Sequence, residues 1–365
     1  MNLADFDYEY PKGQVAQRPL ARRDDSRMMV FDRSSGEIRH SSVASLPEFL
    51  KTGDLVVVND SKVAPARIFG RRGTGEALEV LVIEPAESGR RGPSGQETWR
   101  CLLKKAKRIR DGEKFFFGMQ ATATARGRDG IFLLLEFAPG ALALAMKHHG
   151  APPLPPYIER EGLDAYTEED RSRYQTVYAK RSGSAAAPTA GLHLSETLLS
   201  RIEGAGAKIA HVTLHVGIDT FAPVRAESLS EHRMHGERYE VSQESADEIA
   251  AAKLRGSRVV AVGTTTTRTL ESAALSPGAG KETPVPAGAG VTALFITPGF
   301  EFRAVDALLT NFHQPRSTLL MMVSAFATAP GAPPMSGRDA ILSAYAEAIR
   351  EGYRLFSYGD CMLII

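Results

Sequence analysis

Two histidines stand in short stretches whose composition favours a functional site. His193 ends a run in which Pro188 and Gly191 disfavour a regular helix or strand and favour a shaped loop. His215 lies in 209–216, where polar and apolar residues alternate as in a strand. Imidazole groups exchange protons near neutral pH, so both residues fit acid–base chemistry. The alternative, a packed loop and strand whose histidines are structural, stays open.

The neighbouring elements would position both imidazoles. Ser195 follows the loop and fits the N-cap of a helix that begins at Glu196. Loop N–H groups that open onto a helix N-terminus form a natural anion site. In the strand, a period of two places His211, Thr213 and His215 on one face. We therefore expect a loop, a helix start and a strand face to form one wall of a site.

Polar residues also follow two other predicted strands. Asn59 and Asp60 come directly after the apolar run 55–58, which predicts a buried strand. They could hold a hydroxyl-bearing ligand, although Asn and Asp equally often make a plain turn. A second strand, 258–262, ends at the run 263–268, which carries four threonines and an arginine.

Positive charge is local, because the formal net charge of the chain is only +1. Five cations fall within 104–110, and four of them, called here the basic patch, are Lys104, Lys105, Lys107 and Arg108. The basic patch could contact RNA phosphates. A solvated strand edge, where lysines discourage aggregation, is the alternative. The segment 18–27, with four arginines, is a second candidate for an RNA contact.

The sequence pattern between 70 and 150 differs from that of the rest of the chain. Short β-like runs alternate there with Gly- and Arg-rich connections, which is typical of a small all-β module. The proline-rich run 152–156 then leads back to alternating helix and strand patterns. We predict an α/β protein whose main mixed α/β domain, residues 1–69 and 151–365, carries an inserted all-β, barrel-like domain at 70–150.

The sequence lacks the features of several classes of protein. Two distant cysteines, Cys101 and Cys361, provide neither a disulfide framework nor a CxxC metal motif, so we expect a cytoplasmic protein. The N-terminus does not resemble a signal peptide, and no apolar run approaches the ~18 residues of a membrane span. Dinucleotide, P-loop, HExxH and GxSxG patterns are absent from the sequence. We expect no metal site.

Together these stretches resemble one family, the S-adenosylmethionine:tRNA ribosyltransferase-isomerases of queuosine biosynthesis. The most specific segments are APTAGLH ending at His193, TLHVG ending at Gly217 and TNFH ending at His313. Weaker matches are PPLPPYI at 152–158, YQTVYA at 174–179, RTLES at 268–272 and FSYGD at 356–360. The sequence departs from the family pattern at Leu194, Asp219 and Gln314, and Asp219 adds a carboxylate beside an expected ligand loop.

The resemblance implies a specific reaction. Family members transfer the ribosyl part of S-adenosylmethionine to 7-aminomethyl-7-deazaguanine at the wobble position of tRNA. Rearrangement gives epoxyqueuosine and releases adenine and methionine. S-adenosylmethionine is then a consumed substrate, so no cofactor is expected. We expect a monomer that binds tRNA and S-adenosylmethionine and has no contact with a membrane.

The chemistry of this reaction suggests roles for residues that lie in or near these motifs. His193 and His215 are the expected catalytic residues. From its local charge, the basic patch, or else the segment 18–27, is the expected RNA contact. Arg268 is the expected partner of the substrate carboxylate, and Asn59, Asp60, Thr189 and Asn311 could hold ribose hydroxyls or adenine edges. His313 completes the expected substrate-binding set.

Two other functions remain open at this stage. One is a tRNA-binding protein without catalysis, in which the histidines are structural. The other is an S-adenosylmethionine-dependent RNA methyltransferase. The released products discriminate among the three, because only methyl transfer yields S-adenosylhomocysteine and only the transferase-isomerase yields adenine and methionine.

Overall fold

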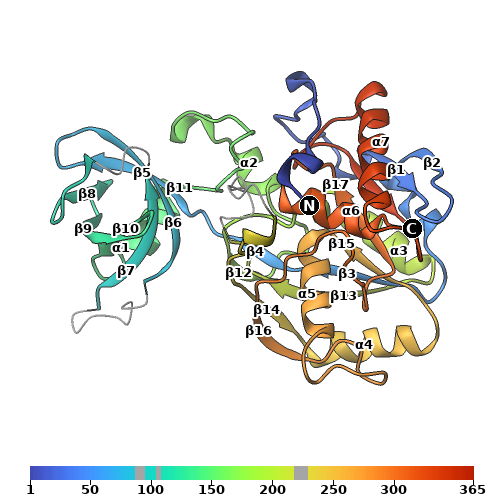
Figure 1. The fold of residues 1–365 in the computed structure, drawn as a ribbon. Helices are drawn as coiled ribbons and strands as arrows, with labels where there is room; N and C mark the ends of the chain where they lie inside the picture. The colour runs from blue at the N-terminus through green and yellow to red at the C-terminus, as the bar shows by residue number, and fades with distance from the viewer. Residues whose placement is uncertain (87–94, 104–107, 218–228) are drawn as a thin grey trace.

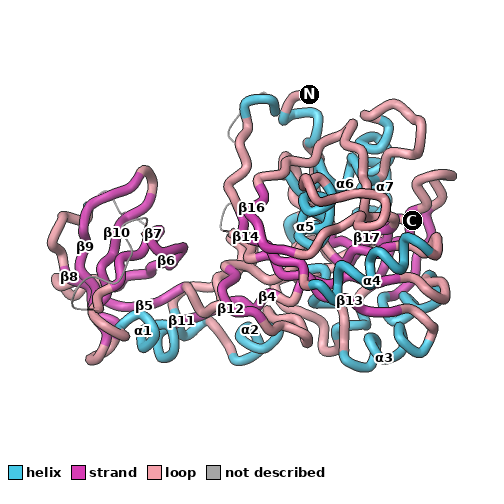
Figure 2. The backbone as a smooth tube through the Cα atoms, turned by 90° about the horizontal axis from the view of Figure 1, so that it is seen from below, coloured by secondary structure: helices cyan, strands magenta, loops and turns pink. Residues whose placement is uncertain are grey.

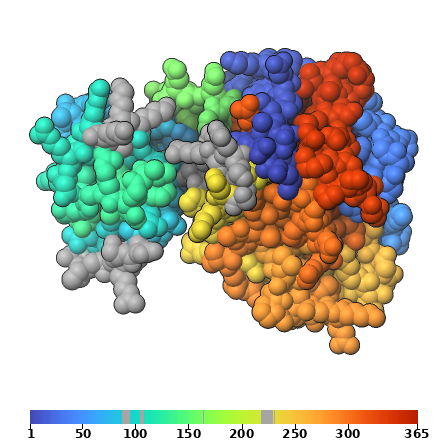
Figure 3. All heavy atoms as spheres, viewed as in Figure 1, coloured from blue at the N-terminus to red at the C-terminus, as the bar shows by residue number. Residues whose placement is uncertain are grey.

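The computed structural model describes residues 1–86, 95–103, 108–217 and 229–365. Within these residues the chain forms a main domain and a separate β domain, seen as two lobes in Figure 1 and Figure 2. The space-filling view in Figure 3 shows the β domain, coloured cyan to green, standing beside the main domain. This arrangement confirms the predicted mixed α/β fold with a smaller inserted all-β domain.

A mixed sheet forms the centre of the main domain. Its nine described strands have the order β16-β14-β13-β3-β15-β17-β18-β1-β2. In chain order they are β1 (Arg27–Phe31), β2 (Ile38–Ser42), β3 (Leu55–Asn59), β13 (Lys208–Leu214), β14 (Glu237–Val241), β15 (Val259–Val262), β16 (Gly288–Thr292), β17 (Ala307–Asn311) and β18 (Cys361–Ile364). β3, β13, β15 and β17 run parallel to one another.

Helices cover both faces of this sheet. On one face α3 buries Leu198 and Ile202 against Val56 and Val260; full burial of such a side chain contributes about 1.5–3 kcal/mol. The other described helices of the main domain, apart from the short α2, cover the opposite face. The helices are α2 (Glu168–Arg173), α3 (Glu196–Gly204), α4 (Gln243–Leu254), α5 (Thr264–Ala274), α6 (Thr318–Phe326) and α7 (Ser336–Arg350). β3 and β15 are therefore buried on both sides, which explains their continuous valine-rich sequences.

A serine at the N-cap starts two of these helices. The Ser195 hydroxyl accepts from the N–H of Leu198 at 3.1 Å and caps α3, as predicted. The Ser317 hydroxyl does the same for the N–H of Leu320 at the start of α6. Each cap provides an acceptor for a helix N–H that has no partner within the helix.

The inserted domain is an antiparallel sheet that closes on itself. Its strand order is β11-β5-β6-β7-β10-β9-β8, and pairing of β5 with β8 closes the barrel. The strands are β5 (Arg67–Arg72), β6 (Ala77–Pro85), β7 (Glu97–Leu103), β8 (Lys114–Phe117), β9 (Ala121–Asp129), β10 (Phe132–Phe137) and β11 (Gly150–Ala151), and α1 spans Ala141–His149. Alternate residues of these strands fill the interior. The two domains are linked through β4 (Ser61–Val63), which pairs in parallel with β12 (Arg181–Ser184).

Candidate active site

The carboxyl ends of the parallel strands bring distant segments together. Asn59 ends β3, His215 follows β13, Gly263 follows β15 and Asn311 ends β17. In the sheet, β13 lies on one side of β3 and β15 lies on the other. The connections from β3 therefore lead in opposite directions along the sheet, and the strand ends named above lie at this change of direction. In open α/β sheets this edge is the usual position of a ligand site.

The loop that carries His193 covers this edge. It forms the short 3-10 helix η7 (Thr189–His193), in which Ala190, Gly191 and His193 are buried. A Cβ atom at Gly191 would collide with the Tyr178 hydroxyl, so the close approach of these segments requires glycine. The structure thus places the predicted loop directly above the parallel strands.

Two small pockets open beside this loop. Both are lined by Thr189, Asn311, His313 and Leu319, and each has a volume of about 30 Å³. Whole ligands of drug size usually occupy about 300 Å³ or more. Each pocket therefore fits one end of a substrate and not a whole nucleoside. Three of the residues predicted to bind substrate meet here.

One pocket also receives the N-terminus of α5. Gly263 precedes the helix with φ of 92°, and it has no side chain that could cap it. Among the described residues, nothing accepts from the N–H groups of Thr264, Thr265 or Thr266. These free N–H groups and the helix dipole create a partial positive charge at the pocket. The sequence analysis did not identify this feature, although a glycine directly after a buried strand is a known signal for such a turn.

Asn311 connects the pockets to His193. Its Nδ2 donates to Nε2 of His193 at 3.0 Å and to the carbonyl of Phe356 at 3.2 Å. A carbonyl only accepts, so the amide nitrogen must face it, and His193 Nε2 is then an acceptor on a neutral ring. Burial, with Arg354 and Arg23 adding to it, lowers the pKa of His193 to about 4. Asn311 Oδ1 is buried and has no hydrogen-bond partner in the described structure.

His313 is held firmly at the pocket wall. Its Nε2 shares a hydrogen bond of 2.8 Å with Oγ1 of Thr310. Its backbone N–H donates to the hydroxyl of Tyr345, and its carbonyl accepts from the hydroxyl of Tyr8. Burial lowers the pKa of His313 to about 3, so the imidazole is neutral at physiological pH. A neutral, fixed imidazole facing a pocket fits the expected substrate contact.

Asn59 is held from within the protein. Its Nδ2 donates to the Leu214 carbonyl and to Thr265 Oγ1, at 3.1 and 3.2 Å. Its Oδ1 accepts from the N–H groups of Ser61 and Leu214, each at 3.0 Å. All four hydrogen-bonding positions of the amide are used, and the contact with Thr265 fixes the start of α5. Its predicted contact with substrate stays a prediction.

Asp60 faces a different cavity of about 590 Å³. Its Oδ1 accepts from Oγ1 of Thr213 at 2.6 Å. His211 and Thr213, from the strand face predicted in the sequence, line this cavity together with charged side chains of both signs. Asp60 therefore lies near the small pockets along the same strand edge but opens into a separate space.

His215 and Arg268 do not themselves line these pockets, although Val216 and Thr265, which line one of them, are close to each in the chain. His215 is half-buried, and burial, followed by the charge of Arg238, lowers its pKa. Its Nδ1 is buried without a partner in the described structure. Arg268 forms a buried ion pair with Glu237 and donates to the carbonyl of Leu294. The predicted roles of both residues stay predictions.

Only some of the other residues named in the sequence analysis lie in the described part of the structure. In the basic patch, Lys104, Lys105 and Lys107 lie outside the described residues, whereas Arg108 is exposed near the start of β8. The departure at Asp219 also lies outside them. In the described part, no cluster of three His, Cys, Asp or Glu side chains could hold a metal ion. No helix in that part is both long and apolar enough to cross a bilayer.

Polar pockets at the carboxyl edge of parallel strands are typical of α/β enzymes, and the comparisons with known proteins identify the family. Residues 3–364 match the family model described as queuosine biosynthesis protein. The chain is 48% identical over 367 residues to the S-adenosylmethionine:tRNA ribosyltransferase-isomerase of Anaeromyxobacter dehalogenans (strain 2CP-C). It is 49% identical over 366 residues to that of Anaeromyxobacter sp. (strain Fw109-5). Both alignments cover 100% of this chain and 99% of the relative.

A solved structure is also similar. It is an S-adenosylmethionine tRNA ribosyltransferase from Thermotoga maritima, with 35% identity and a TM-score of 0.53 over 99% of this chain and 100% of that one. The chain therefore belongs to the S-adenosylmethionine:tRNA ribosyltransferase-isomerase family of queuosine biosynthesis. The resemblance noted in the sequence motifs is confirmed.

Proposed function

We propose that the protein transfers and isomerises the ribosyl group of S-adenosylmethionine onto 7-aminomethyl-7-deazaguanine at the wobble position of tRNA. The products are epoxyqueuosine in tRNA, adenine and methionine. The observation that carries this proposal is identity of 48–49% to named transferase-isomerases along essentially the whole of both chains. The polar pockets beyond the carboxyl ends of β13, β15 and β17 support the proposal as a candidate site for this reaction.

The amino-acid end of S-adenosylmethionine fits the pocket at α5. We assign its carboxylate to the free N–H groups of Thr264, Thr265 and Thr266 and its ammonium group to Oδ1 of Asn311. A carboxylate satisfies the helix N-terminus, and a buried acceptor without a partner is satisfied by an ammonium donor. The pocket volume of about 30 Å³ suits this small, zwitterionic end. Arg268 is already paired with Glu237, so the contact expected between Arg268 and the carboxylate stays a separate prediction.

The chemistry requires groups that move protons. The sulfonium makes the adjacent 5′ C–H acidic, so a base must remove that proton, and adenine needs a proton as it leaves. Neutral imidazoles can accept protons, and burial holds His193 and His313 in the neutral form. His193 and His215 stay our candidates for proton transfer. His313, which lines both pockets, is assigned to substrate positioning.

Product analysis tests the reaction. Purified protein is incubated with S-adenosylmethionine and tRNA that carries 7-aminomethyl-7-deazaguanine, and the small molecules are separated by chromatography. We expect adenine and methionine in equal amounts, and none with tRNA that carries guanine at the same position. Formation of S-adenosylhomocysteine would support methyl transfer instead. Binding without any product from an enzyme preparation that is fully folded would support a non-catalytic tRNA-binding protein.

We further propose that the protein acts as a monomer in the cytoplasm. The two cysteines, Cys101 and Cys361, are both buried as free thiols, which suits a reducing compartment. Sedimentation of the purified protein with and without tRNA tests the oligomeric state. A stable dimer at micromolar concentration would contradict the proposal.

A further inference from the structure

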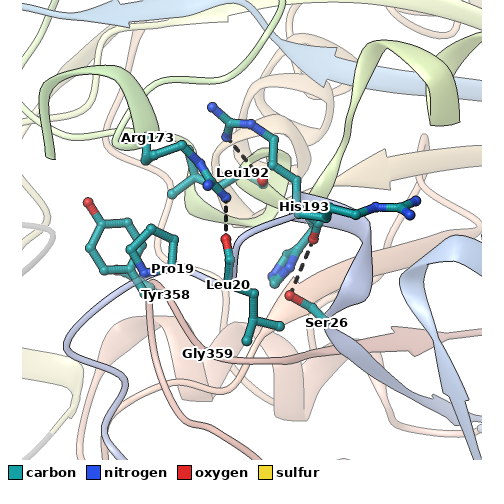
Figure 4. A pocket seen from close by; sticks show the side chains of 11 residues that line it. Pro19, Leu20, Ser26, Arg173, Leu192, His193, Tyr358 and Gly359 are labelled. Carbon is teal, nitrogen blue, oxygen red and sulfur yellow. Dashed lines mark hydrogen bonds between the residues drawn. The ribbon is translucent and has the colours of Figure 1, made fainter. Parts of the chain in front are cut away.

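A third small pocket lies on the other side of His193. It is bordered by the N-terminal segment, the end of α2 and the FSYGD segment, and Figure 4 shows it from close by. Its residues are Pro19, Leu20, Arg22, Arg23, Ser26, Arg173, Leu192, His193, Ser357, Tyr358 and Gly359. Its volume is about 20 Å³, enough for one or two water-sized groups and far too small for a nucleobase.

Two of the arginines that line this pocket, Arg23 and Arg173, have no acidic partner in the described part of the chain. Arg23 and Arg173 donate only to backbone carbonyls, and no carboxylate in the described structure lies within ion-pair distance of either. The accepting carbonyls belong to Leu20, Ala21, Ser172 and Leu192. Arg173 also keeps a buried Nε without a partner. Guanidinium groups rarely stay partly buried without an anion, because burial of unpaired charge is costly.

The acidic side chains beside the pocket contact groups other than Arg23 and Arg173, and Asp25 lies 3.6 Å from the guanidinium of Arg22. Asp24 accepts from the Ser195 hydroxyl and lies 3.5 Å from the guanidinium of Arg22. Asp360 accepts from the backbone N–H groups of Arg27 and Arg354. Arg23 and Arg173 therefore bring positive charge to the pocket that no carboxylate of the described structure pairs with.

The pKa shifts of Arg23 and His193 are consistent with positive charge at this pocket. Burial and then the charge of Arg173 lower the pKa of Arg23. The charges of Arg354 and Arg23 add to the effect of burial in lowering the pKa of His193.

We propose that this pocket binds a backbone phosphate of the RNA substrate, next to the nucleotide whose base enters the active site. The planar donors of arginine match phosphate oxygens, and a pocket of this size admits oxygen atoms of an anion but no base. Ser357 lines both this pocket and one of the substrate pockets. His193 borders the arginine pocket and, through Asn311, reaches the substrate pockets. The identity of the anion as tRNA phosphate rests on the proposed function.

Salt-dependent tRNA binding tests the pocket. The variants are Arg22→Gln, which removes the charge of a side chain that is 71% exposed, and Arg173→Lys, which keeps the charge but loses the fork of donors. The matched control is Arg255→Gln, an exposed arginine at the end of α4, which Figure 1 places at the far end of the main domain. The melting temperature of each protein is measured, and each tRNA affinity is corrected for the fraction of protein that is folded under the conditions of the assay.

We expect both pocket variants to bind tRNA roughly 10-fold more weakly than the wild type. For Arg22→Gln, the slope of log affinity against log salt should also fall by about 0.7. Turnover at saturating tRNA should stay within about twofold for both variants, because the pocket anchors the RNA and does not contact the reacting atoms. The control should match the wild type. Wild-type affinity in both pocket variants, or equal loss in the control, would overturn the proposal.

A short RNA separates this proposal from the proposed function. The isolated anticodon stem–loop contains the phosphates next to the wobble nucleotide, so its affinity should fall by the same factor as that of whole tRNA. Loss of affinity for whole tRNA alone would place the bound phosphate elsewhere and refute its proximity to the active site. If the variants lose affinity for both RNAs but the wild type releases no adenine, the phosphate pocket stands and the proposed reaction fails.

Discussion

Replacing Asn311 with alanine tests the assignment of the amino-acid subsite. The substitution removes Oδ1, the buried acceptor without a partner that we assign to the substrate ammonium group. It also removes the Nδ2 donations to His193 and to the Phe356 carbonyl. The variant therefore affects both substrate binding and stability, and the two effects must be measured separately.

The size of each effect follows from the contacts. A hydrogen bond to a charged group contributes about 1.5–3 kcal/mol, so loss of the ammonium contact should raise the Michaelis constant for S-adenosylmethionine by roughly 10- to 150-fold. Two buried acceptors, His193 Nε2 and the Phe356 carbonyl, lose their donor, at about 1–3 kcal/mol each. We expect the free energy of unfolding to fall by about 2–6 kcal/mol, the sum of these two losses.

Asn59→Ala is the matched control. Asn59 is also a buried asparagine at the carboxyl end of a parallel strand, but all four of its hydrogen-bonding positions are occupied by protein groups. Its replacement should cost at least as much stability and change the Michaelis constant for S-adenosylmethionine by less than about threefold. Steady-state kinetics at saturating tRNA, with urea unfolding of the same samples, give both quantities. An unchanged Michaelis constant in folded Asn311→Ala, or an equal rise in Asn59→Ala, would refute the assignment.

Three further predictions concern the histidines and the basic patch. His193→Asn and His215→Asn should each lower turnover per folded molecule by ~100-fold or more if the residue transfers a proton, whereas a structural histidine would lower only the melting temperature. The folded protein resists protonating His193 and His313, whose pKa values burial lowers to about 4 and about 3, while the unfolded chain takes up protons below about pH 6.5. Stability should therefore fall as pH drops from 6.5 to 4, by up to about 1.4 kcal/mol per pH unit for each histidine, and urea midpoints of His193→Asn should fall less. Alanine replacement of the whole basic patch should raise the Michaelis constant for tRNA more than it lowers turnover; unchanged tRNA affinity would make the patch a solvated edge.

The sequence predicted those parts of the fold that depend on local signals. Ser195 caps a helix as expected, because an N-cap needs only a hydroxyl at the right position. The inserted β domain was predicted from its short β-like runs, which Gly- and Arg-rich connections separate. A barrel-like domain was predicted, but the strand pair that closes it could not be derived from the sequence pattern, because Arg71 and Phe116, paired between β5 and β8, are far apart in the chain.

The helix α5 shows why part of the site could not be predicted. Its first four residues are threonines, which have low helix propensity and were interpreted only as the end of a strand. Burial on all sides in the main domain stabilises the helix, so tertiary packing outweighs local preference. The unpartnered Oδ1 of Asn311 could not be predicted from the sequence either. The orientation of this amide depends on contacts with His193 and Phe356, which lie in other segments of the chain.

The position of β18 in the sheet has a consequence for biosynthesis. Strand β18 lies between β17 and β1, and Met28 pairs with Cys361. At translation rates of about 5–20 residues per second, the intervening stretch of roughly 330 residues takes about 20–70 s to synthesise. Throughout that time the apolar strand Met28–Phe31 lacks its parallel partner and the helices that later cover it. The nascent chain therefore carries an uncovered strand edge for most of its translation, which makes it a natural client for a ribosome-associated chaperone.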